Sequence, residues 1–223
     1  MPPLPHPNLH PWVLTPSEAV ALQRDLAARV VSTRPIDLSR VQRVAGVDVS
    51  VKGDLSRGAI VVLSFPELEL IELARATRPT PFPYISGLLS FREGPVILDA
   101  YERLAHTPDA LIFDGQGMAH PRRLGLASHV GLWLERPTIG CGKTRLIGEH
   151  DEPGLEKGVF APLRHQGDTI GCVLRTRASV KPVYISVGHL ATLESARALV
   201  MACTPRYRLP EPIRQAHRLA ALP

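Results

Sequence analysis

The strongest constraint on the fold is a change in the pattern of apolar segments along the chain. Residues 41–49, 58–65 and 67–77 read as three strands with short links, which favours an antiparallel meander. Short apolar strands at 110–114 and 138–142 then alternate with helical segments, and further strands are expected at 170–176 and 183–187. Such alternation is typical of parallel strands. We therefore expect an α/β fold with one mixed sheet that starts antiparallel, finishes parallel and is flanked by helices.

Helices are expected at five places in the chain. The clearest begins after Thr15, where Pro16 suits the first helical position and Glu18 can complete a capping box. Apolar residues at helical spacing extend it to about residue 31. The other helices are expected at 95–104, 125–134, 193–203 and after Pro212.

The length of 223 residues allows one sizeable core, so we expect a single domain over 1–223 with a Pro-rich lead at about 1–14. The lead lacks the basic start and apolar stretch of a signal peptide. No uninterrupted apolar run reaches the roughly 18 residues of a membrane span. We expect a cytoplasmic protein without membrane association.

Composition adds two constraints. The formal charge of +5 and pI of about 9.4 fit a polyanionic partner such as nucleic acid, without requiring one. The three cysteines, Cys141, Cys172 and Cys203, are odd in number and widely spaced. That arrangement argues against a disulfide framework or a zinc site and favours reduced, buried thiols.

Three carboxylates are candidates for a metal site. Asp48 and Asp114 each end an apolar strand, and Glu93 begins the helical segment between them. If the two strands are neighbours, the aspartates can converge and offer the oxygen ligands that Mg²⁺ prefers. The alternative is that each aspartate caps a turn and that Glu93 favours a helix start.

The densest polar segment runs from residue 114 to 123. Its glycines, Gly115 and Gly117, allow a backbone to approach a ligand closely, while His120, Arg122 and Arg123 could contact phosphate. An ordinary surface loop remains the alternative.

Gly142-Lys143-Thr144 is reminiscent of a nucleotide-binding P-loop. The glycine that this motif requires five residues before the Gly-Lys-Thr is replaced by Pro137, so the match fails. Lys143 nevertheless follows an apolar strand and could contact a phosphate as a point charge.

Residues 81–87, here called the wedge loop, place Phe82, Tyr84 and Ile85 on a proline-braced segment. Apolar side chains on such a loop can enter a base stack and support an extruded nucleotide. Packing of the same side chains into the core is the alternative. The basic tail at 206–218 ends near His217, which could be a ligand or an ordinary surface histidine.

Five of these segments, in this order, resemble the endonuclease V family. The resemblance extends from about Arg43 to Arg218 and rests on residues 44–49, 83–94, 114–122, 140–143 and 207–218. It implies a ribonuclease-H-like fold and hydrolysis of the second phosphodiester bond on the 3′ side of deoxyinosine. It also implies Mg²⁺ as cofactor, with Mn²⁺ as a substitute, and inosine-containing DNA, single- or double-stranded, as partner of a monomeric enzyme.

The resemblance further implies roles for individual residues. Asp48 and Asp114 correspond to the principal metal ligands, and Glu93 to a third catalytic carboxylate. His217 would lie near the metal, and Lys143 would contact the scissile phosphate or the attacking water. Tyr84, flanked by Pro83 and Ile85, corresponds to the residue that fills the gap left by the flipped base. The loop containing Gly115, Gln116, Gly117 and His120 would help to form the hypoxanthine pocket.

One departure from the family pattern is Ser86, which stands where the family's wedge usually has a second proline. We expect a less rigid wedge, with weaker strand separation or altered lesion preference. Three other functions remain open at this point: a noncatalytic binder of damaged nucleic acid, a ribonuclease directed at inosine in RNA, and another ribonuclease-H-like nuclease such as a junction resolvase.

Overall fold

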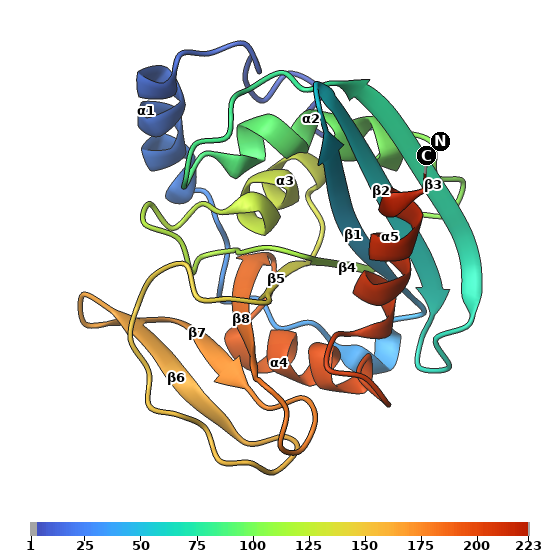
Figure 1. Ribbon diagram of the computed structural model, residues 1–223, viewed down its shortest axis with the longest axis vertical. Coiled ribbons are helices and arrows are strands. Elements are labelled where there is room, and N and C mark those ends of the chain that lie inside the picture. Colours follow the sequence, from blue (N-terminus) through green and yellow to red (C-terminus); the bar gives the residue numbers. More distant parts are fainter. Residues whose placement is uncertain (1–3, 223) are drawn as a thin grey trace.

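In the computed structural model, which describes residues 4–222, one eight-stranded sheet passes through the whole molecule (Figure 1). Its strands lie in the order β3-β2-β1-β4-β5-β8-β7-β6. Their bounds are β1 Arg43–Lys52, β2 Leu55–Ser64, β3 Leu70–Pro79, β4 Ala110–Phe113, β5 Thr138–Gly142, β6 Phe160–His165, β7 Asp168–Leu174 and β8 Val183–His189.

Helices cover both faces of this sheet (Figure 1). Helices α2 (Leu89–Tyr101) and α3 (Leu126–Leu134) enclose one apolar core with β1, β2 and β4, and α4 (Leu193–Ala202) and α5 (Glu211–Ala221) enclose another on the opposite face. Helix α1 (Pro16–Ala27) packs beside α3 and the wedge loop, and a short 3₁₀ helix (Leu38–Arg40) precedes β1.

The mixed sheet flanked by helices is confirmed, with one correction. Strands β1, β2 and β3 pair antiparallel, and β1–β4 and β4–β5 pair parallel, as expected. Beyond β5 the sheet becomes antiparallel again through β8, β7 and β6, so it does not finish parallel. The reason is that no helix separates β5, β6, β7 and β8, and strands joined without a crossover reverse direction.

The bounds of α3, α4 and β5 agree with the predictions to within one residue, whereas those of α1 and α2 differ. The capping box of Thr15 and Glu18 is formed, although α1 ends at Ala27 rather than near residue 31. Helix α2 starts at Leu89 and carries Pro95 inside it, so Glu93 lies in its second turn and not at its start. Strand β6 was not predicted, because it is an edge strand that contains Pro162 and has few buried residues.

The Pro-rich lead packs onto the core along its described part, whereas Pro2 and Pro3 lie outside the described residues. Leu4, Leu9 and Trp12 contact the core beneath α2 and α3. Trp12 also stacks on Trp133, with 5.2 Å between ring centroids. Buried His10 accepts hydrogen bonds at Nε2 from His129 Nε2 (2.7 Å) and Trp133 Nε1 (3.1 Å), while its Nδ1 donates to the carbonyl of Pro11. Residues 4–14 are therefore part of the fold.

Two further expectations can be compared with the structure. All three cysteines are buried and free, and burial raises the pKa of the Cys172 and Cys203 thiols to about 12. Within residues 4–222, none of the helices combines the length and apolar character that crossing a bilayer requires.

Candidate active site

Asp48 and Asp114 are brought together by the parallel pairing of β1 and β4. The register places Val47 opposite Phe113, so each aspartate is the next residue along its own strand direction. The backbone N–H of Asp114 donates to the carbonyl of Val47 over 3.0 Å, which extends the pairing to that residue. The prediction that the two strands are neighbours is therefore confirmed. Only Asp114 follows the end of its strand, because β1 continues beyond Asp48 to Lys52.

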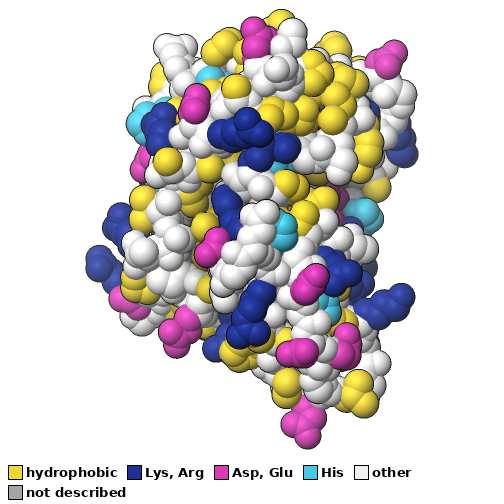
Figure 2. All heavy atoms as spheres, turned by 90° about the vertical axis from the view of Figure 1, so that its left-hand side faces the viewer, with side chains coloured by type: hydrophobic (Ala, Val, Ile, Leu, Met, Phe, Trp, Pro, Cys, Tyr) yellow, Lys and Arg dark blue, Asp and Glu magenta, His cyan; other side chains and the backbone are white. Residues whose placement is uncertain are grey.

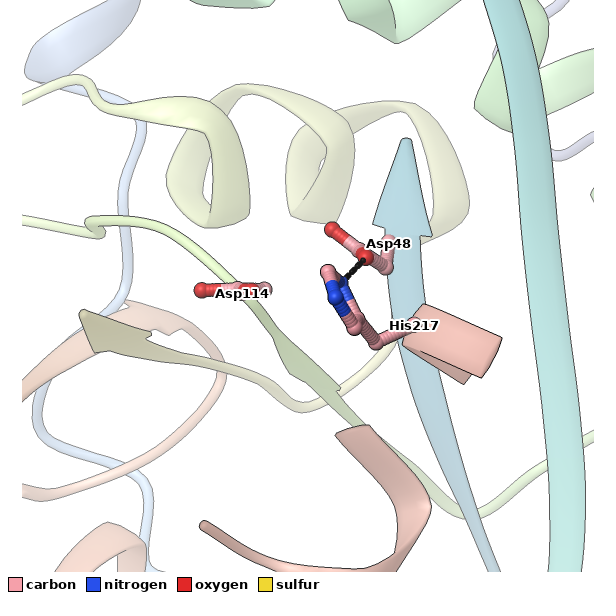
Figure 3. Close-up of side chains that lie close together, drawn as sticks. All are labelled: Asp48, Asp114 and His217. Atoms are coloured by element: carbon pink, nitrogen blue, oxygen red, sulfur yellow. Dashed lines mark hydrogen bonds and ion pairs between the residues drawn. The ribbon is translucent and has the colours of Figure 1, made fainter. Parts of the chain in front are cut away.

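His217 joins the two aspartates from helix α5, which packs on β1 (Figure 3). Its Nδ1 lies 2.7 Å from Asp48 Oδ2. Helix α5 can approach β1 this closely because β1 contains Gly46: a Cβ atom there would lie 2.1 Å from the carbonyl carbon of Pro212. A side chain at position 46 would push α5 outward and take His217 away from Asp48.

These three residues form a cluster that can hold a cation. One ligand atom from each of Asp48, Asp114 and His217 lies within 4.8 Å of the others. Burial, followed by the negative charge of Asp114, raises the pKa of Asp48 above its ordinary value, although the hydrogen bond from His217 opposes the shift. A divalent cation would relieve this repulsion, so the donor set fits a carboxylate-bound metal ion.

Lys143 lies directly after β5, the parallel neighbour of β4. Its ammonium group forms an ion pair with Asp114. The backbone carbonyl of Lys143 accepts a 2.8 Å hydrogen bond from Arg208, which also binds the carbonyl of Pro182. A cationic side chain is thus fixed beside the acidic cluster.

Glu93 stands beside this cluster rather than within it. It projects from helix α2, and it is not one of the described residues whose ligand atoms group within 4.8 Å. Burial, then the charges of Asp48 and Asp114, raise the pKa of Glu93 to about 8, against the opposing effect of Arg92. The carboxyl is thus close enough to feel both aspartates and is protonated at neutral pH when no cation is bound.

A cavity of about 300 Å³ adjoins the acidic cluster. Its walls include the wedge loop, the segment that begins with Asp114, Gly115 and Gln116, and Lys143. Asp114 and Lys143 therefore face both the candidate metal cluster and the cavity. A cavity of this size is within the range of pockets that enclose a small ligand or a single base.

The wedge loop presents one aromatic side chain to solvent. Tyr84 is 75% exposed, and Pro83 and Ser86 are also exposed. Phe82 is buried against Phe91, and Ile85 packs partly against the same cluster. The core-packing alternative therefore holds for Phe82, whereas Tyr84 is exposed and available for stacking on a base.

The polar segment 114–123 is more tightly folded than its composition suggested. Gln116 donates from Nε2 to the carbonyl of Thr144, so the segment is tied to the loop after β5. His120 is buried; its Nε2 donates to the carbonyl of Gly87 (2.9 Å) and its Nδ1 accepts from the backbone N–H of Arg122 (3.2 Å). Desolvation lowers the pKa of His120 to about 4, so the ring is neutral.

These side chains also have partners within the protein, and the expectation that His120, Arg122 and Arg123 contact phosphate stays a prediction. Both ring nitrogens of His120 are engaged within the protein. The Arg122 guanidinium binds Gln23 and the Gly87 carbonyl, and the Arg123 guanidinium binds His165 and Asp168 of the β6–β7 hairpin. The three side chains join neighbouring segments of the chain, because each has a closer partner inside the fold.

Sequence reasoning missed Gln23 and Arg208. Gln23 is buried on the inner face of α1 between Ala19 and Leu26. A polar residue at that spacing on an apolar helix face is a signal that could have identified it, because buried amides need partners. Arg208 gave no signal beyond the basic composition of the tail.

The mixed sheet, the aspartates on the adjacent strands β1 and β4 and the cavity beside them fit the class of α/β nucleases. The sequence profile of the endonuclease V family matches residues 24–218. An endonuclease V of Trichormus variabilis is 52% identical over 214 residues, which is 95% of this chain and 96% of that protein. The chain therefore belongs to the endonuclease V family. This membership confirms the expected activity as a DNA repair endonuclease.

Solved structures agree with this assignment. The endonuclease V of Streptomyces avermitilis superposes with a TM-score of 0.90 at 42% identity, covering 94% of this chain and 92% of that one. The catalytic domain of human endonuclease V gives 0.84 at 34% identity, covering 92% and 93%. An endonuclease V of Ciona intestinalis, solved with a 24mer DNA containing an inosine followed by a ribo-adenosine, gives 0.80 at 26% identity, covering 92% and 95%. The expected ribonuclease-H-like fold is confirmed.

Proposed function

We propose that the protein is a Mg²⁺-dependent endonuclease that recognises deoxyinosine in DNA and hydrolyses the second phosphodiester bond on its 3′ side. The observation that carries this proposal is the shared wall between the acidic cluster and the cavity, formed by Asp114 and Lys143. A base held in the cavity would leave its 3′ backbone close to the cluster. The relative from Ciona intestinalis, which binds an inosine-containing DNA, supports the choice of ligand.

The acidic residues have different roles in this proposal, according to their positions. Asp48 and Asp114 would hold the cation, which suits Mg²⁺ because both offer hard oxygen atoms. A bound divalent cation activates water and stabilises the leaving oxygen of a phosphodiester. His217 orients the Asp48 carboxylate through its hydrogen bond. Glu93, held close to both aspartates, accepts or donates a proton near the same centre.

Lys143 would bind the scissile phosphate or the attacking water. Its ion pair with Asp114 keeps the ammonium group at the edge of the cavity. When a phosphate enters, that cation can be shared between the carboxylate and the phosphate oxygens. The hydrogen bond from the Arg208 guanidinium to the backbone carbonyl of Lys143 fixes the position of this lysine.

The wedge loop and the 114–117 segment would form the two walls of the base site. Exposed Tyr84, between Pro83 and Ile85, would stack on the neighbouring base and fill the space left by the flipped nucleotide. Gly115, Gln116 and Gly117 would offer backbone groups to the base edge. His120, which is buried and neutral and lines the cavity, would help to form this pocket and would also hold the wedge loop.

The charge distribution is compatible with a nucleic-acid path across this side of the molecule. Lys and Arg side chains are spread over the face that carries α1 and the β6–β7 hairpin, with Asp and Glu side chains among them (Figure 2). The basic side chains on this face would attract a phosphate backbone. We infer that one copy of the chain is sufficient, since the acidic cluster and the cavity are built from residues of a single chain.

The deciding experiment is strand cleavage of matched DNA and RNA oligonucleotides that each carry one central inosine, with Mg²⁺, with Mn²⁺ and with a chelator. We expect a metal-dependent cut one nucleotide beyond inosine, and the ratio of DNA to RNA rates identifies the preferred backbone. Binding without cutting on either substrate would replace the proposal with a noncatalytic binder. A preference for branched DNA without inosine would favour a resolvase-like nuclease.

A further inference from the structure

The carbonyl of Gly87, at the C-terminal end of the wedge loop, is the meeting point of three side chains. It lies 3.0 Å from Gln23 Nε2, 2.9 Å from His120 Nε2 and 2.7 Å from Arg122 Nη2. All three nitrogens donate, and they come from α1 and from the segment after β4. A carbonyl oxygen has two lone pairs, so this one is fully supplied with donors.

The donors are themselves connected. Arg122 Nε donates to Gln23 Oε1 over 2.6 Å, and the backbone N–H of Arg122 donates to His120 Nδ1 over 3.2 Å. Gln23 Nε2 also reaches the carbonyl of Leu124 at 3.1 Å. Gln23 is almost entirely buried, with 1% exposure, so its amide has no water to replace these partners. Networks of this kind hold a single arrangement when every member is satisfied.

The backbone at Gly87 is suited to this arrangement. Its φ of +79° lies in the left-handed region that favours glycine, and a Cβ atom there would lie 2.7 Å from Arg122 Nη2. The other end of the wedge loop is also fixed, because Arg92 donates to the carbonyl of Phe82 over 2.9 Å. Exposed Tyr84 and Ser86 therefore belong to a short span held at both ends.

We propose that Gln23 and Arg122 are positioning residues, which hold the wedge loop over the base cavity through the Gly87 carbonyl. Neither residue needs to touch nucleic acid for this role. The purpose of the wedge rests on the proposed function. The hydrogen bonds that the Gly87 carbonyl accepts from Gln23, His120 and Arg122, here called the clamp, are present in the free protein. It also gives Ser86, which has no ring to restrict the backbone, an external source of rigidity.

The test is hydrogen exchange in the free protein across residues 83–88. The amide of Leu88 is the most direct probe, because it donates to the carbonyl of Ile85 inside this loop. In Arg122→Gln we expect this segment to exchange about five- to tenfold faster, the change in local opening that loss of one or two hydrogen bonds produces. The matched control is Arg123→Gln, since Arg123 is adjacent but bonds to the β6–β7 hairpin.

A second variant covers the case in which Arg122→Gln fails to fold. Gln23→Met keeps a side chain of similar length and removes all three hydrogen bonds of the amide, so it should loosen the same segment. Unchanged exchange at 83–88 in the folded variant, relative to the native protein and Arg123→Gln, overturns the clamp. Faster exchange that spreads evenly over the whole chain also overturns it, because that pattern indicates general destabilisation.

A cleavage measurement links the clamp to the reaction. With an inosine substrate we expect Arg122→Gln to raise KM about tenfold and to change kcat by less than about twofold, because the acidic cluster is untouched. A fall in kcat at unchanged KM contradicts a positioning role for the wedge. If the native protein cuts no inosine substrate, the proposed function fails while the exchange result still decides whether the clamp exists.

Discussion

His217 Nδ1 lies 2.7 Å from Asp48 Oδ2, although the two residues are separated by 169 positions in the chain. Helix α5 packs on the sheet face to which the Asp48 side chain points, and the contact depends on the tight packing of α5 against Gly46. The proposed role of the histidine, to orient a carboxylate that would bind the metal, can be tested.

Replacing His217 with alanine should weaken metal binding about 10- to 100-fold, the usual effect of removing a partner that orients a ligand. The measurement is the Mg²⁺ concentration that gives half-maximal cleavage. His106→Ala is a suitable control, because His106 also pairs with a carboxylate, Glu72, at 3.1 Å. An equal Mg²⁺ requirement in His217→Ala and the native protein would remove His217 from the site.

Asp48→Asn and Asp114→Asn should abolish cutting, with rates at least about 100-fold lower, by the same reasoning applied to the ligands themselves. Asp48→Asn should nevertheless leave the metal-free fold intact, because burial and the Asp114 charge already disfavour its ionised form. We expect its melting temperature in a chelator to be within about 2–4 °C of the native value. Near-native rates at low Mg²⁺ in both variants would refute the metal assignment.

Glu93 should make the stability of the metal-free protein depend on pH. Its pKa is about 8 in the folded protein and 4.5 at its ordinary value, so between these limits the folded state keeps a proton that the unfolded chain releases. The contribution of Glu93 to stability is therefore complete below pH 4.5 and is lost as pH rises through 8. Urea unfolding in a chelator should show that Glu93→Gln gains stability over the native protein across this range. Parallel curves for the two proteins would show that the carboxyl is not perturbed.

Tyr84→Ala should reduce binding to inosine-containing DNA by about 1–3 kcal/mol, the typical value of one base–aromatic stack. Binding to undamaged DNA should change much less, because phosphate contacts dominate it. Titrations of both duplexes at two salt concentrations separate the two effects. An equal loss on both duplexes would contradict the wedge role of Tyr84.

Ser86→Pro tests whether the missing ring makes the wedge less effective. If the loop is too mobile, proline should improve affinity for inosine duplexes by restricting the unbound loop. The measurement compares cleavage rates and affinities of the variant and the native protein on the same duplex. Identical values would show that Ser86 does not limit the wedge, an outcome that the clamp at Gly87 would explain.

Most features that could be predicted from the sequence depend on residues that are close together in the chain. The capping box at Thr15 and the bounds of β5 each follow from residues close in the chain. The contact of His217 with Asp48 depends on the packing of α5 on the sheet, and periodicity contains no information about it. The burial of His120 was missed for the same reason, because its partners at Gly87 and Arg122 are set by the tertiary fold.

The stacked pair of Trp12 and Trp133 has a practical consequence for spectroscopy. These are the only two tryptophans in the chain, and both lie where the N-terminal lead meets α3. Intrinsic fluorescence excited at tryptophan therefore reports whether the lead is docked. Trp12 also packs against the cluster that contains Phe82 of the wedge loop, and against Gly94 in the middle of α2, next to Glu93. A change in that emission on adding nucleic acid would therefore mean that binding at the site is felt where the lead packs on α2.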